Sequence, residues 1–558
     1  MNIARHLVAF AIVLLSWWPA AAQRQMVAAA HPLAAEAGME MLRAGGSALD
    51  AAVAVQLVLG LVEPQSSGIG GGAFLVHRSA EGGLRSFDGR ETAPAAATPD
   101  LFLTAEGKPM AFYDAVVGGR AVGVPGALAM LSDAHATFGR LPWASLFQPA
   151  IRLAEQGFAV SPRLARAIAN EGERLKRDPA ARGYFFLADG APLPAGHVLL
   201  NQDYAHSLRL IAAQGTEPFY RGEIAESIVA AVAGADWNPG RMTRADLARY
   251  RAVERPVVCG AFRLFRVCGM GPPSSGGIAV AQILGLMDHF ALPARQPFAD
   301  IAHIGIEAGK LAFADRAAYL GDPDFVAVPA AGLLDRAYLT ARAQLIDPDR
   351  ANTPRAGNPP WRRAAYEPAE SFAEEAGTSH LSIVDRFGNA VAMTTTVEDA
   401  FGARIMAAGF ILNNQLTDFA FAPEQEGRQV ANRVEAGKRP RSSMAPSIVL
   451  RADGTLHAVV GSPGGARIIG YVAKTLVGML AWNLSAQAAI DLPNVLTVGT
   501  VAELEQGTEA AGLARALEAR GQRVQVRALE SGVQAIEVTP TGLRGGADRR
   551  REGVVLGQ

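Results

Sequence analysis

Two alternating segments separated by a short turn constrain the C-terminal third of the chain more than any other feature. Residues 380–385 (HLSIVD) alternate, residues 386–389 (RFGN) are typical of a turn, and residues 390–397 (AVAMTTTV) alternate again. This pattern predicts an antiparallel β-hairpin with its turn centred on Phe387. Thr378 and Thr396 are equally far from that centre, so we expect the hairpin to place them opposite each other.

The segment before this hairpin has a different composition. Residues 345–376 are dominated by Pro, Asn, Arg and Glu with little periodicity, which predicts an exposed and flexible stretch. It ends at Gly377, and a loop with small residues is where a chain is cut most easily. A cut before Thr378 would leave a hydroxyl and an α-amine on one residue. Such an amine has a pKa near 7.7–8.0 and can accept the hydroxyl proton, although a strand start is the commoner explanation for Gly-Thr.

The first 22 residues have the layout of a secretory signal peptide. A basic start with Arg5 precedes the uncharged run from Leu7 to Trp18, and small residues at 20–22 offer a cleavage site. A membrane anchor is the alternative, but a spanning helix needs about 20 apolar residues. We therefore expect a mature chain from Gln23 that is periplasmic or secreted, without a stable membrane anchor.

Export would place the two cysteines of the chain in an oxidising compartment. Cys259 and Cys268 are nine residues apart, around an apolar and basic run that predicts a strand pair near residues 257–267. A short hairpin would bring them together as a disulfide. Two buried free thiols are the alternative.

Charge and motif content exclude several function classes. The chain has 52 Lys and Arg against 53 Asp and Glu, so the basic excess typical of nucleic-acid binders is missing. The sequence has no H-E-x-x-H motif, no Cys/His cluster with zinc spacing and no Walker A motif. The glycine run at 68–72 leads into the apolar segment AFLV, whereas a dinucleotide fingerprint opens a helix. We expect neither a metal nor an organic cofactor.

Seven ordered motifs resemble the γ-glutamyltransferase (γ-glutamyltranspeptidase) family. They are PQSSGIGGGAF at 64–74, DGRETAP at 88–94, GTSHLSIVD at 377–385, GNAVAMTTT at 388–396, ILNNQLTDF at 411–419, GKRPRSSMAPSIV at 437–449 and GSPGGARIIG at 461–470. The resemblance runs from about residue 26 to the C-terminus. It implies an α+β fold, the four-layer αββα sandwich of N-terminal nucleophile hydrolases. It also implies a precursor that cuts itself into chains 23–377 and 378–558, which remain together as a heterodimer.

The resemblance assigns a catalytic role to four residues. Thr378 would be the nucleophile with its own amine as general base, and the cut would fall between Gly377 and Thr378. Thr396 matches the second threonine, which positions the nucleophile. Gly464 and Gly465 match the glycine pair whose amides form the oxyanion hole, and outside this context a helix-entry turn explains them equally well. His380 is interpreted as structural.

Five further residues match the positions that hold the substrate. The α-carboxylate of the substrate would bind Arg90, Ser442 and Ser443, because a guanidinium fork suits a carboxylate. The α-ammonium would bind Asp418 and Gln415. Taken singly, each has an ordinary explanation as a turn residue or a surface ion pair.

Two departures from the family pattern bear on specificity. Glu398 stands where well-studied members carry Asn, and it would add a negative charge near a site that must admit a carboxylate. The stretch from Asp418 to Lys438 is short and has no Tyr, which predicts a form without a lid loop.

The resemblance implies cleavage of γ-glutamyl amides such as glutathione through an acyl-threonine, with water, an amino acid or a peptide as acceptor. A glutaryl- or cephalosporin-type acylase of the same fold is the first alternative. A non-catalytic secreted binding protein is the second.

Overall fold

The computed structural model describes residues 23–293, 298–362, 366–367 and 377–558. The predicted signal peptide at 1–22 lies outside the described residues, as does part of the predicted flexible stretch at 345–376. In the described part, no helix combines the length and the apolar character needed to cross a bilayer.

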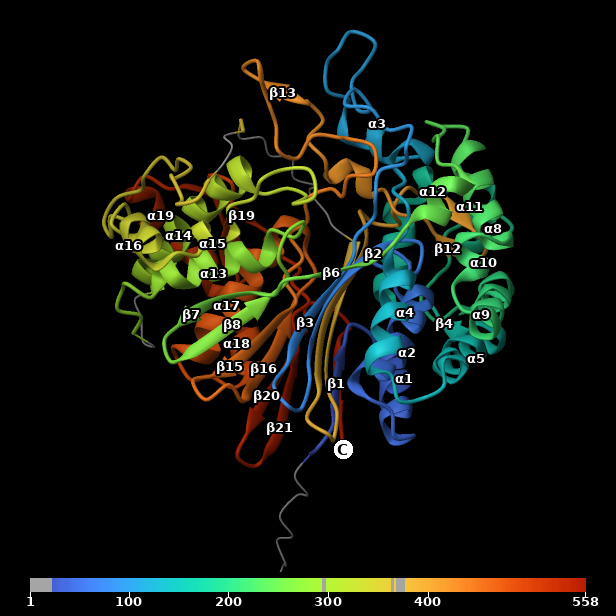
Figure 1. Ribbon diagram of the computed structural model, residues 1–558, viewed down its shortest axis with the longest axis horizontal. Coiled ribbons are helices and arrows are strands. Elements are labelled where there is room, and N and C mark those ends of the chain that lie inside the picture. Colours follow the sequence, from blue (N-terminus) through green and yellow to red (C-terminus); the bar gives the residue numbers. More distant parts are fainter. Residues whose placement is uncertain (1–22, 294–297, 363–365, 368–376) are drawn as a thin grey trace, which may run out of the picture.

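The elements form four layers, with two antiparallel sheets packed face to face between two layers of helices (Figure 1). The strands of the first sheet are, in spatial order, β22 (Val554–Gly557), β1 (Met26–Ala29), β9 (Gly377–Val384), β10 (Ala390–Glu398), β2 (Gly72–Arg78), β3 (Leu84–Gly89) and β6 (Val253–Arg255). The strands of the second sheet are β21 (Gly542–Ala547), β20 (Gln534–Thr539), β16 (Leu456–Gly461), β15 (Ser447–Arg451), β8 (Phe265–Gly269) and β7 (Val258–Phe262). The four-layer αββα sandwich expected from the sequence is confirmed.

Helices from the N-terminal part of the chain cover the outer face of the first sheet. They include α1 (Pro32–Arg43), α2 (Ala48–Val62), α4 (Ala127–Phe138), α5 (Gln148–Gln156) and α9 (Gln202–Gln214). Ser47 and Asp50 form a capping box at the start of α2, because each side chain accepts a hydrogen bond from the other's backbone N–H. Every residue of α2 except Gly60 is buried, as a helix between a sheet and further helices requires.

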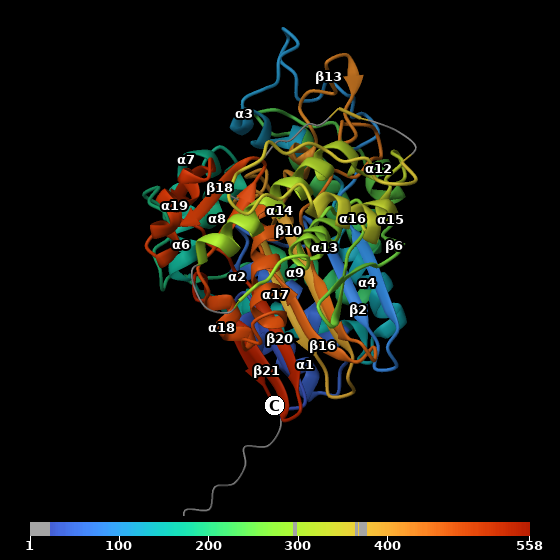
Figure 2. The ribbon, with the colours of Figure 1, turned by 90° about the vertical axis from the view of Figure 1, so that its left-hand side faces the viewer.

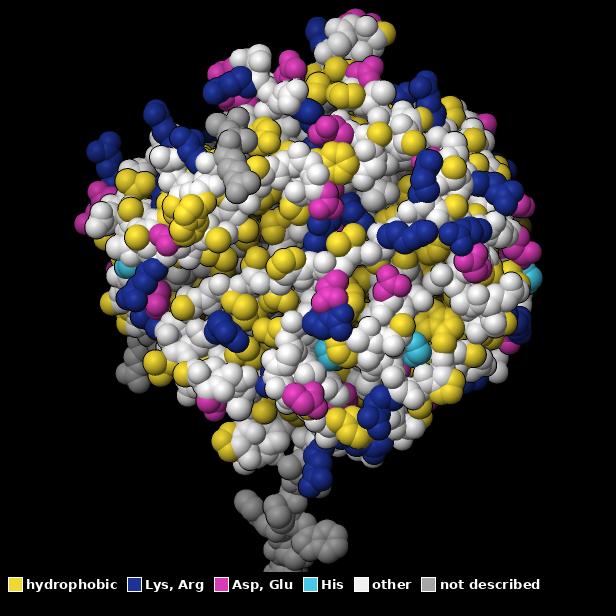
Figure 3. Space-filling model, viewed as in Figure 1, with side chains coloured by type: hydrophobic (Ala, Val, Ile, Leu, Met, Phe, Trp, Pro, Cys, Tyr) yellow, Lys and Arg dark blue, Asp and Glu magenta, His cyan; other side chains and the backbone are white. Residues whose placement is uncertain are grey.

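The second sheet is covered by α13 (Gly276–Met287), α14 (Phe298–Tyr319), α17 (Ile468–Leu480) and α18 (Ala486–Asp491). Figure 2 looks onto this helical layer, with the strands of the second sheet behind it. On the face shown in Figure 3, basic and acidic side chains are interspersed, in keeping with the near-zero net charge of the chain.

Shorter elements complete the periphery. The helices among them are α3 (Phe112–Val116), α6 (Pro162–Asn170), α7 (Gly172–Leu175), α8 (Pro179–Phe185), α10 (Glu217–Tyr220), α11 (Glu223–Ala233), α12 (Arg244–Arg249), α15 (Ala330–Leu333), α16 (Arg336–Ala343) and α19 (Ala514–Ala519). The strands are β4 (Phe158–Ala159), β5 (Val198–Leu199), β11 (Met406–Ala407), β12 (Phe410–Ile411), β13 (Glu424–Gln425), β14 (Arg428–Gln429), β17 (Val495–Val498), β18 (Val501–Glu505) and β19 (Arg523–Arg527).

The predicted hairpin is the centre of the first sheet. Strands β9 and β10 pair antiparallel, and Thr396 lies directly opposite Thr378, as the alternation predicted. On its other side Thr396 lies opposite Gly72 of β2. The register shifts by one residue after Thr396, which leaves Glu398 opposite Gly377. The irregularity lies at the end of the strand pair, beside Thr378.

The face of β9 that carries Thr378 points toward the second sheet. His380 and Ser382 lie on the same face, since alternate residues of a strand share a side. The Ser382 hydroxyl donates to the Gln534 carbonyl of β20 at 3.1 Å. A β-carbon at Gly461 of β16 would lie 2.1 Å from the His380 ring, so only glycine fits there. Thr378 therefore stands between the two sheets.

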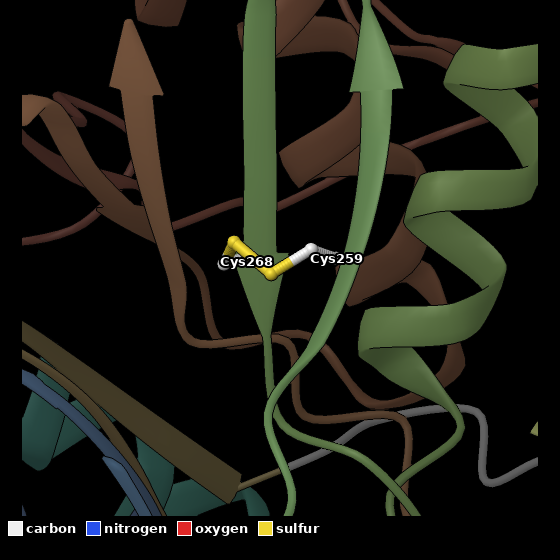
Figure 4. Close-up of a disulfide and its surroundings, with 2 residues drawn as sticks. All are labelled: Cys259 and Cys268. Atoms are coloured by element: carbon white, nitrogen blue, oxygen red, sulfur yellow. A yellow bond between two sulfur atoms is a disulfide. The ribbon is translucent and has the colours of Figure 1, made fainter. Parts of the chain in front are cut away.

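The cysteine pair lies at the far edge of the second sheet. Cys259 and Cys268 face each other across the hairpin of β7 and β8, and their sulfurs are bonded (Figure 4). The structure thus has the disulfide rather than the free thiols.

Candidate active site

The two threonine hydroxyls at the centre of the hairpin are in contact. The Oγ1 atoms of Thr378 and Thr396 are 3.1 Å apart, and both residues are buried. The Thr396 hydroxyl donates its proton to the Gly377 carbonyl at 2.5 Å and accepts from the Glu398 backbone N–H at 2.8 Å. A hydroxyl has one proton to give, so Thr378 must be the donor to Thr396. Thr396 therefore fixes both the Thr378 hydroxyl and the carbonyl that precedes it.

The start of β9 is also held from the helical side. The Ser379 hydroxyl donates to Oε2 of Glu63 at 2.7 Å, and Nη1 of Arg163 donates to Oε1 of the same carboxylate at 2.6 Å. Glu63 is wholly buried just beyond the end of α2. Nη1 of Arg551 donates to the Thr378 carbonyl at 3.1 Å. These contacts fix the backbone on which Thr378 sits.

His380 is a structural residue of the sheet. Its Nδ1 contacts the Thr394 hydroxyl at 2.8 Å, and its Nε2 contacts the Ser382 hydroxyl at 3.1 Å. Burial lowers the pKa of the imidazole to about 3, so the ring is neutral at physiological pH.

A small pocket of about 40 Å³, named the first pocket here, opens at Thr378 between the sheets. Most of the candidate site residues predicted from the sequence line this pocket. Its lining is Arg90, Arg316, Thr378, Thr396, Glu398, Gln415, Asp418, Ser442, Ser443, Met444, Gly465, Ala466 and Ile468. None of the described lining residues comes from 419–441, where a lid loop would lie.

Arg90 and Asp418, assigned by resemblance to opposite ends of a substrate, form an ion pair with each other. Arg90 is completely buried, and its Nη2 donates to Oδ2 of Asp418. The Arg90 Nε donates to the Pro440 carbonyl at 3.0 Å. The Gln415 amide donates to the same Asp418 oxygen at 2.7 Å. The pocket thus presents one fixed cation beside one fixed anion.

Arg316 is a pocket residue that the sequence did not single out. Its Nη2 donates to the Ser443 hydroxyl at 3.0 Å and its Nε donates to the Ser275 hydroxyl at 2.9 Å. Ser442 accepts from the Met444 backbone N–H at 3.1 Å. Nothing in the local pattern of α14 separates Arg316 from an ordinary helix arginine. Only the packing of α14 against the 442–443 segment brings it to the site.

Glu398 lies in a buried, hydrogen-bonded position. Its side chain is buried, and its Oε2 accepts from the Asn414 amide and from the Thr417 hydroxyl at 3.5 Å. Burial, together with the negative charges of Asp418 and Asp399, raises the pKa of this carboxyl well above its usual range. The additional negative charge that the sequence predicts at this position stays a prediction, and burial disfavours it.

The glycine pair lies at the entry to α17. Gly464 and Gly465 have φ values of 129° and 56°, which only glycine adopts readily. A β-carbon on Gly464 would lie 2.6 Å from the Tyr471 ring. Gly465 lines the first pocket together with Thr378, and Gly464 lines a neighbouring pocket together with Gly377. Backbone amides at a helix start are suited to bind an oxyanion.

A threonine at the start of a central strand between two packed sheets, with flanking helices, defines the class of N-terminal nucleophile hydrolases. A comparison with models of known families identifies the family within that class. The family model of γ-glutamyltranspeptidase matches residues 34–558, and the chain belongs to this family of enzymes.

Curated relatives and solved structures agree with this assignment. The chain is 39% identical to the glutathione hydrolase proenzyme of Bacillus subtilis (strain 168), over 95% of this chain and 91% of that protein. It is also 39% identical to the acylase ACY 1 proenzyme of Pseudomonas sp. (strain V22), over 96% and 94% of the two chains. The crystal structure of cephalosporin acylase from Bacillus halodurans superposes with a TM-score of 0.83 at 29% identity, covering 100% of this chain and 97% of that one.

Proposed function

We propose that the chain is exported, cuts itself between Gly377 and Thr378, and then cleaves γ-glutamyl amides such as glutathione as a heterodimer of 23–377 and 378–558. The observation that carries this proposal is the Thr378–Thr396 pair with the Gly377 carbonyl on the same hydroxyl. In support of the proposal, the proposed nucleophile, a polarising donor and the bond proposed to be cut belong to one hydrogen-bonded group. Removal of residues 1–22 in the periplasm or outside the cell completes the maturation.

The reaction follows from the same groups. The Thr378 hydroxyl attacks the side-chain amide carbon, and the freed α-amine of Thr378 takes the hydroxyl proton. The amides of Gly464 and Gly465 bind the oxyanion of the tetrahedral intermediate, a contribution of about 2.7–4 kcal/mol per donor. The amine then passes its proton to the leaving nitrogen, the C–N bond breaks, and an acyl-threonine ester remains. Water, an amino acid or a peptide amine attacks this ester and restores the threonine.

The charge pattern of the first pocket supports a γ-glutamyl donor. A γ-glutamyl group ends in an α-carboxylate and an α-ammonium on one carbon. Arg90 with Ser442 and Ser443 would take the carboxylate, and Asp418 with Gln415 would take the ammonium.

A glutaryl-type acylase is the second candidate, favoured by the 39% identity to the acylase ACY 1 proenzyme. A glutaryl group keeps the carboxylate but lacks the ammonium, so Asp418 decides between the two. Kinetics with γ-glutamyl and glutaryl p-nitroanilides measure this preference directly. Turnover of the glutaryl compound alone would refute the γ-glutamyl assignment.

Mass spectrometry of the purified protein tests maturation. We expect two chains beginning at Gln23 and at Thr378. A single uncut chain that persists for days would refute self-cleavage and favour a non-catalytic binding protein.

A further inference from the structure

A cavity of about 450 Å³, named the apolar cavity here, lies in the helical layer over the second sheet. Its walls come from α13, α14 and α17, which Figure 2 shows, together with β17 and the 3-10 helix Glu509–Leu513. None of its lining residues lines the first pocket or the pocket at Gly377. Its volume is within the range of small-molecule sites, so the cavity has room for a ligand of its own.

Small residues that recur at helical spacing create this space. Those on α14 are Ala299, Ala302, Gly305 and Gly309, and those on α17 are Gly470 and Ala473. Residues three or four apart lie on one face of a helix, so each set faces the cavity as a strip. Larger side chains at these positions would fill the cavity.

The body of the cavity is apolar. Ile283, Met287, Val477 and Leu496 line it, and each is at most 5% exposed. Trp482 also lines it. An apolar wall that faces a hollow rather than packed atoms lacks contacts that a hydrocarbon ligand would supply. Hydrocarbon is therefore the chemistry that the body of the cavity accepts.

Lys474 of α17 brings one positive charge to this apolar wall. Its ammonium donates to the backbone carbonyls of Ile490 and Leu492 at 2.9 Å and 3.0 Å. Leu492 lines the cavity together with Lys474, so the ammonium lies at the wall. An ammonium has three protons to donate, and the two carbonyls take two of them. The third N–H is available to a ligand.

The acids that act on Lys474 are directed elsewhere. Glu505 and Asp548 form ion pairs with Arg550. The exposed Asp491 accepts from a glutamine amide at 2.8 Å. Among the described residues, Lys474 thus has carbonyl partners but no carboxylate partner.

The missing counter-ion is costly for an enclosed ammonium. Burial, with the positive charge of Arg550, lowers the pKa of Lys474 to about 7. A buried charge is stabilised by an opposite charge that is hydrogen-bonded to it. A carboxylate at the third N–H would supply that charge, so an anionic head on an apolar tail fits the cavity better than a neutral molecule.

The only other charged residue among the described lining residues is at the rim. Glu509 is exposed, as is Gly512 in the same 3-10 helix, and the cavity reaches solvent there. Since Glu509 faces water and Lys474 is enclosed, the charge that a ligand meets inside the cavity is positive.

We propose that the apolar cavity is a binding site for an apolar monocarboxylate, such as a medium-chain fatty acid. The carboxylate binds the ammonium of Lys474, and the hydrocarbon tail lies among α13, α14 and α17. This site is separate from the acyl transfer proposed at Thr378, and binding does not require that reaction.

Isothermal titration calorimetry of the full chain with octanoate and octanamide tests the role of the charge. The two ligands share a tail and a carbonyl group, and only octanoate is charged. We expect octanoate to bind about tenfold more tightly, the effect of one charge-assisted hydrogen bond. Equal affinity for the two ligands, or no binding of octanoate at millimolar concentration, would overturn the proposal.

Two variants locate the ligand. Lys474→Met keeps an apolar stem and removes the ammonium, so the preference for octanoate should fall to near one. A β-carbon at Gly512 would meet no atom within 4 Å, so the backbone accepts a side chain there. Gly512→Phe should fill part of the cavity and weaken both ligands about tenfold, because less of the tail is buried.

Matched substitutions outside the cavity are the controls. Lys108→Met removes an exposed lysine, and Gly183→Phe adds a ring at an exposed glycine with equally open surroundings. Neither should change the affinity for either ligand.

A preference for octanoate that persists in Lys474→Met, or affinities that are unchanged in Gly512→Phe, would overturn the proposal. Octanoate would then be bound elsewhere, for example at Arg90. If Lys474→Met does not fold, the ligand preference of the unaltered protein and the affinities of Gly512→Phe still decide. A loss in a control equal to that in its matched variant would also overturn the assignment to this cavity.

Discussion

The first pocket, which Thr378 lines, differs in size and in charge from the neighbouring pocket, which Gly377 and Gly464 line. The first is small, and its charged groups are already paired, with Arg90 bound to Asp418 and Arg316 bound to two serines. The neighbouring pocket measures about 480 Å³ against about 40 Å³, and five arginines and two glutamates line it. The fixed, paired groups of the small pocket suit recognition of one acyl end, which is the role proposed for it.

Replacement of Thr378, the proposed nucleophile, should have the largest effect. Thr378→Ala removes the hydroxyl that attacks in cleavage and in turnover, so we expect an uncut chain without activity. Electrophoresis and an anilide assay measure the two losses. Thr378→Ser, which keeps a hydroxyl, is the control and should still be cut. Processed and active Thr378→Ala protein would contradict the nucleophile assignment.

A change confined to the first pocket should alter donor selection. Asp418→Asn removes the anion expected to bind the α-ammonium and leaves Arg90 without its carboxylate partner. We expect kcat/KM for γ-glutamyl p-nitroanilide to fall about thirty- to a hundredfold, with a much smaller change for the glutaryl compound. Equal losses for both donors would mean that Asp418 only supports the fold.

Glu91, which lies beside Arg90 of the first pocket, makes the stability of the fold depend on pH. It is wholly buried 3.8 Å from Nη1 of Arg90, over Gly72, and neither carboxyl oxygen has a hydrogen-bond partner among the described residues. Burial raises its pKa to about 8, against an ordinary value of 4.5. The folded state therefore keeps a proton that the unfolded state loses between these pH values.

The contribution of Glu91 to the free energy of unfolding is fully present below about pH 4.5 and is lost as the pH rises to about 8. The neutral isostere Glu91→Gln should reduce this decline. Thermal unfolding at pH 5.5 and 8.5 measures it, and we expect the midpoint of the unaltered protein to fall by a few degrees more than that of the variant. An equal fall in the unfolding midpoint of the two proteins would refute the raised pKa of Glu91.

The smallest effect on activity should come from a change outside both pockets. Replacing Cys259 and Cys268 together by Ser opens the bond between β7 and β8, strands at the edge of the second sheet that line neither pocket. A disulfide closing so short a loop stabilises by about 2–3 kcal/mol. We expect a lower unfolding midpoint, with kcat/KM unchanged. A change in kcat/KM would show that the edge hairpin is coupled to the site.

Local patterns were sufficient where the interacting residues are near in sequence. Alternation around a turn predicted that Thr378 and Thr396 are paired, and the capping box of Ser47 and Asp50 that begins α2 is likewise local in sequence. Hairpin register and helix caps depend on residues within one or two turns, so a single chain read in order contains them. The longer motifs at Arg90, Asp418 and Gly464 identified the family by resemblance rather than by local physics.

Only the tertiary structure decided the environment of Glu398 and the division of the site. Burial and the charges of Asp418 and Asp399 raise the pKa of Glu398, and of these influences only Asp399 is a neighbour in sequence. Arg316 and Arg551 reach Thr378 from segments 62 and 173 residues away (378 − 316 and 551 − 378). Long-range packing places Thr378 on the wall of a small pocket and Gly377 on the wall of a larger one lined by five arginines. The sequence thus determined the pairing of Thr378 with Thr396 and the family, because these depend on local alternation and ordered motifs, whereas long-range packing determined which distant side chains surround Thr378.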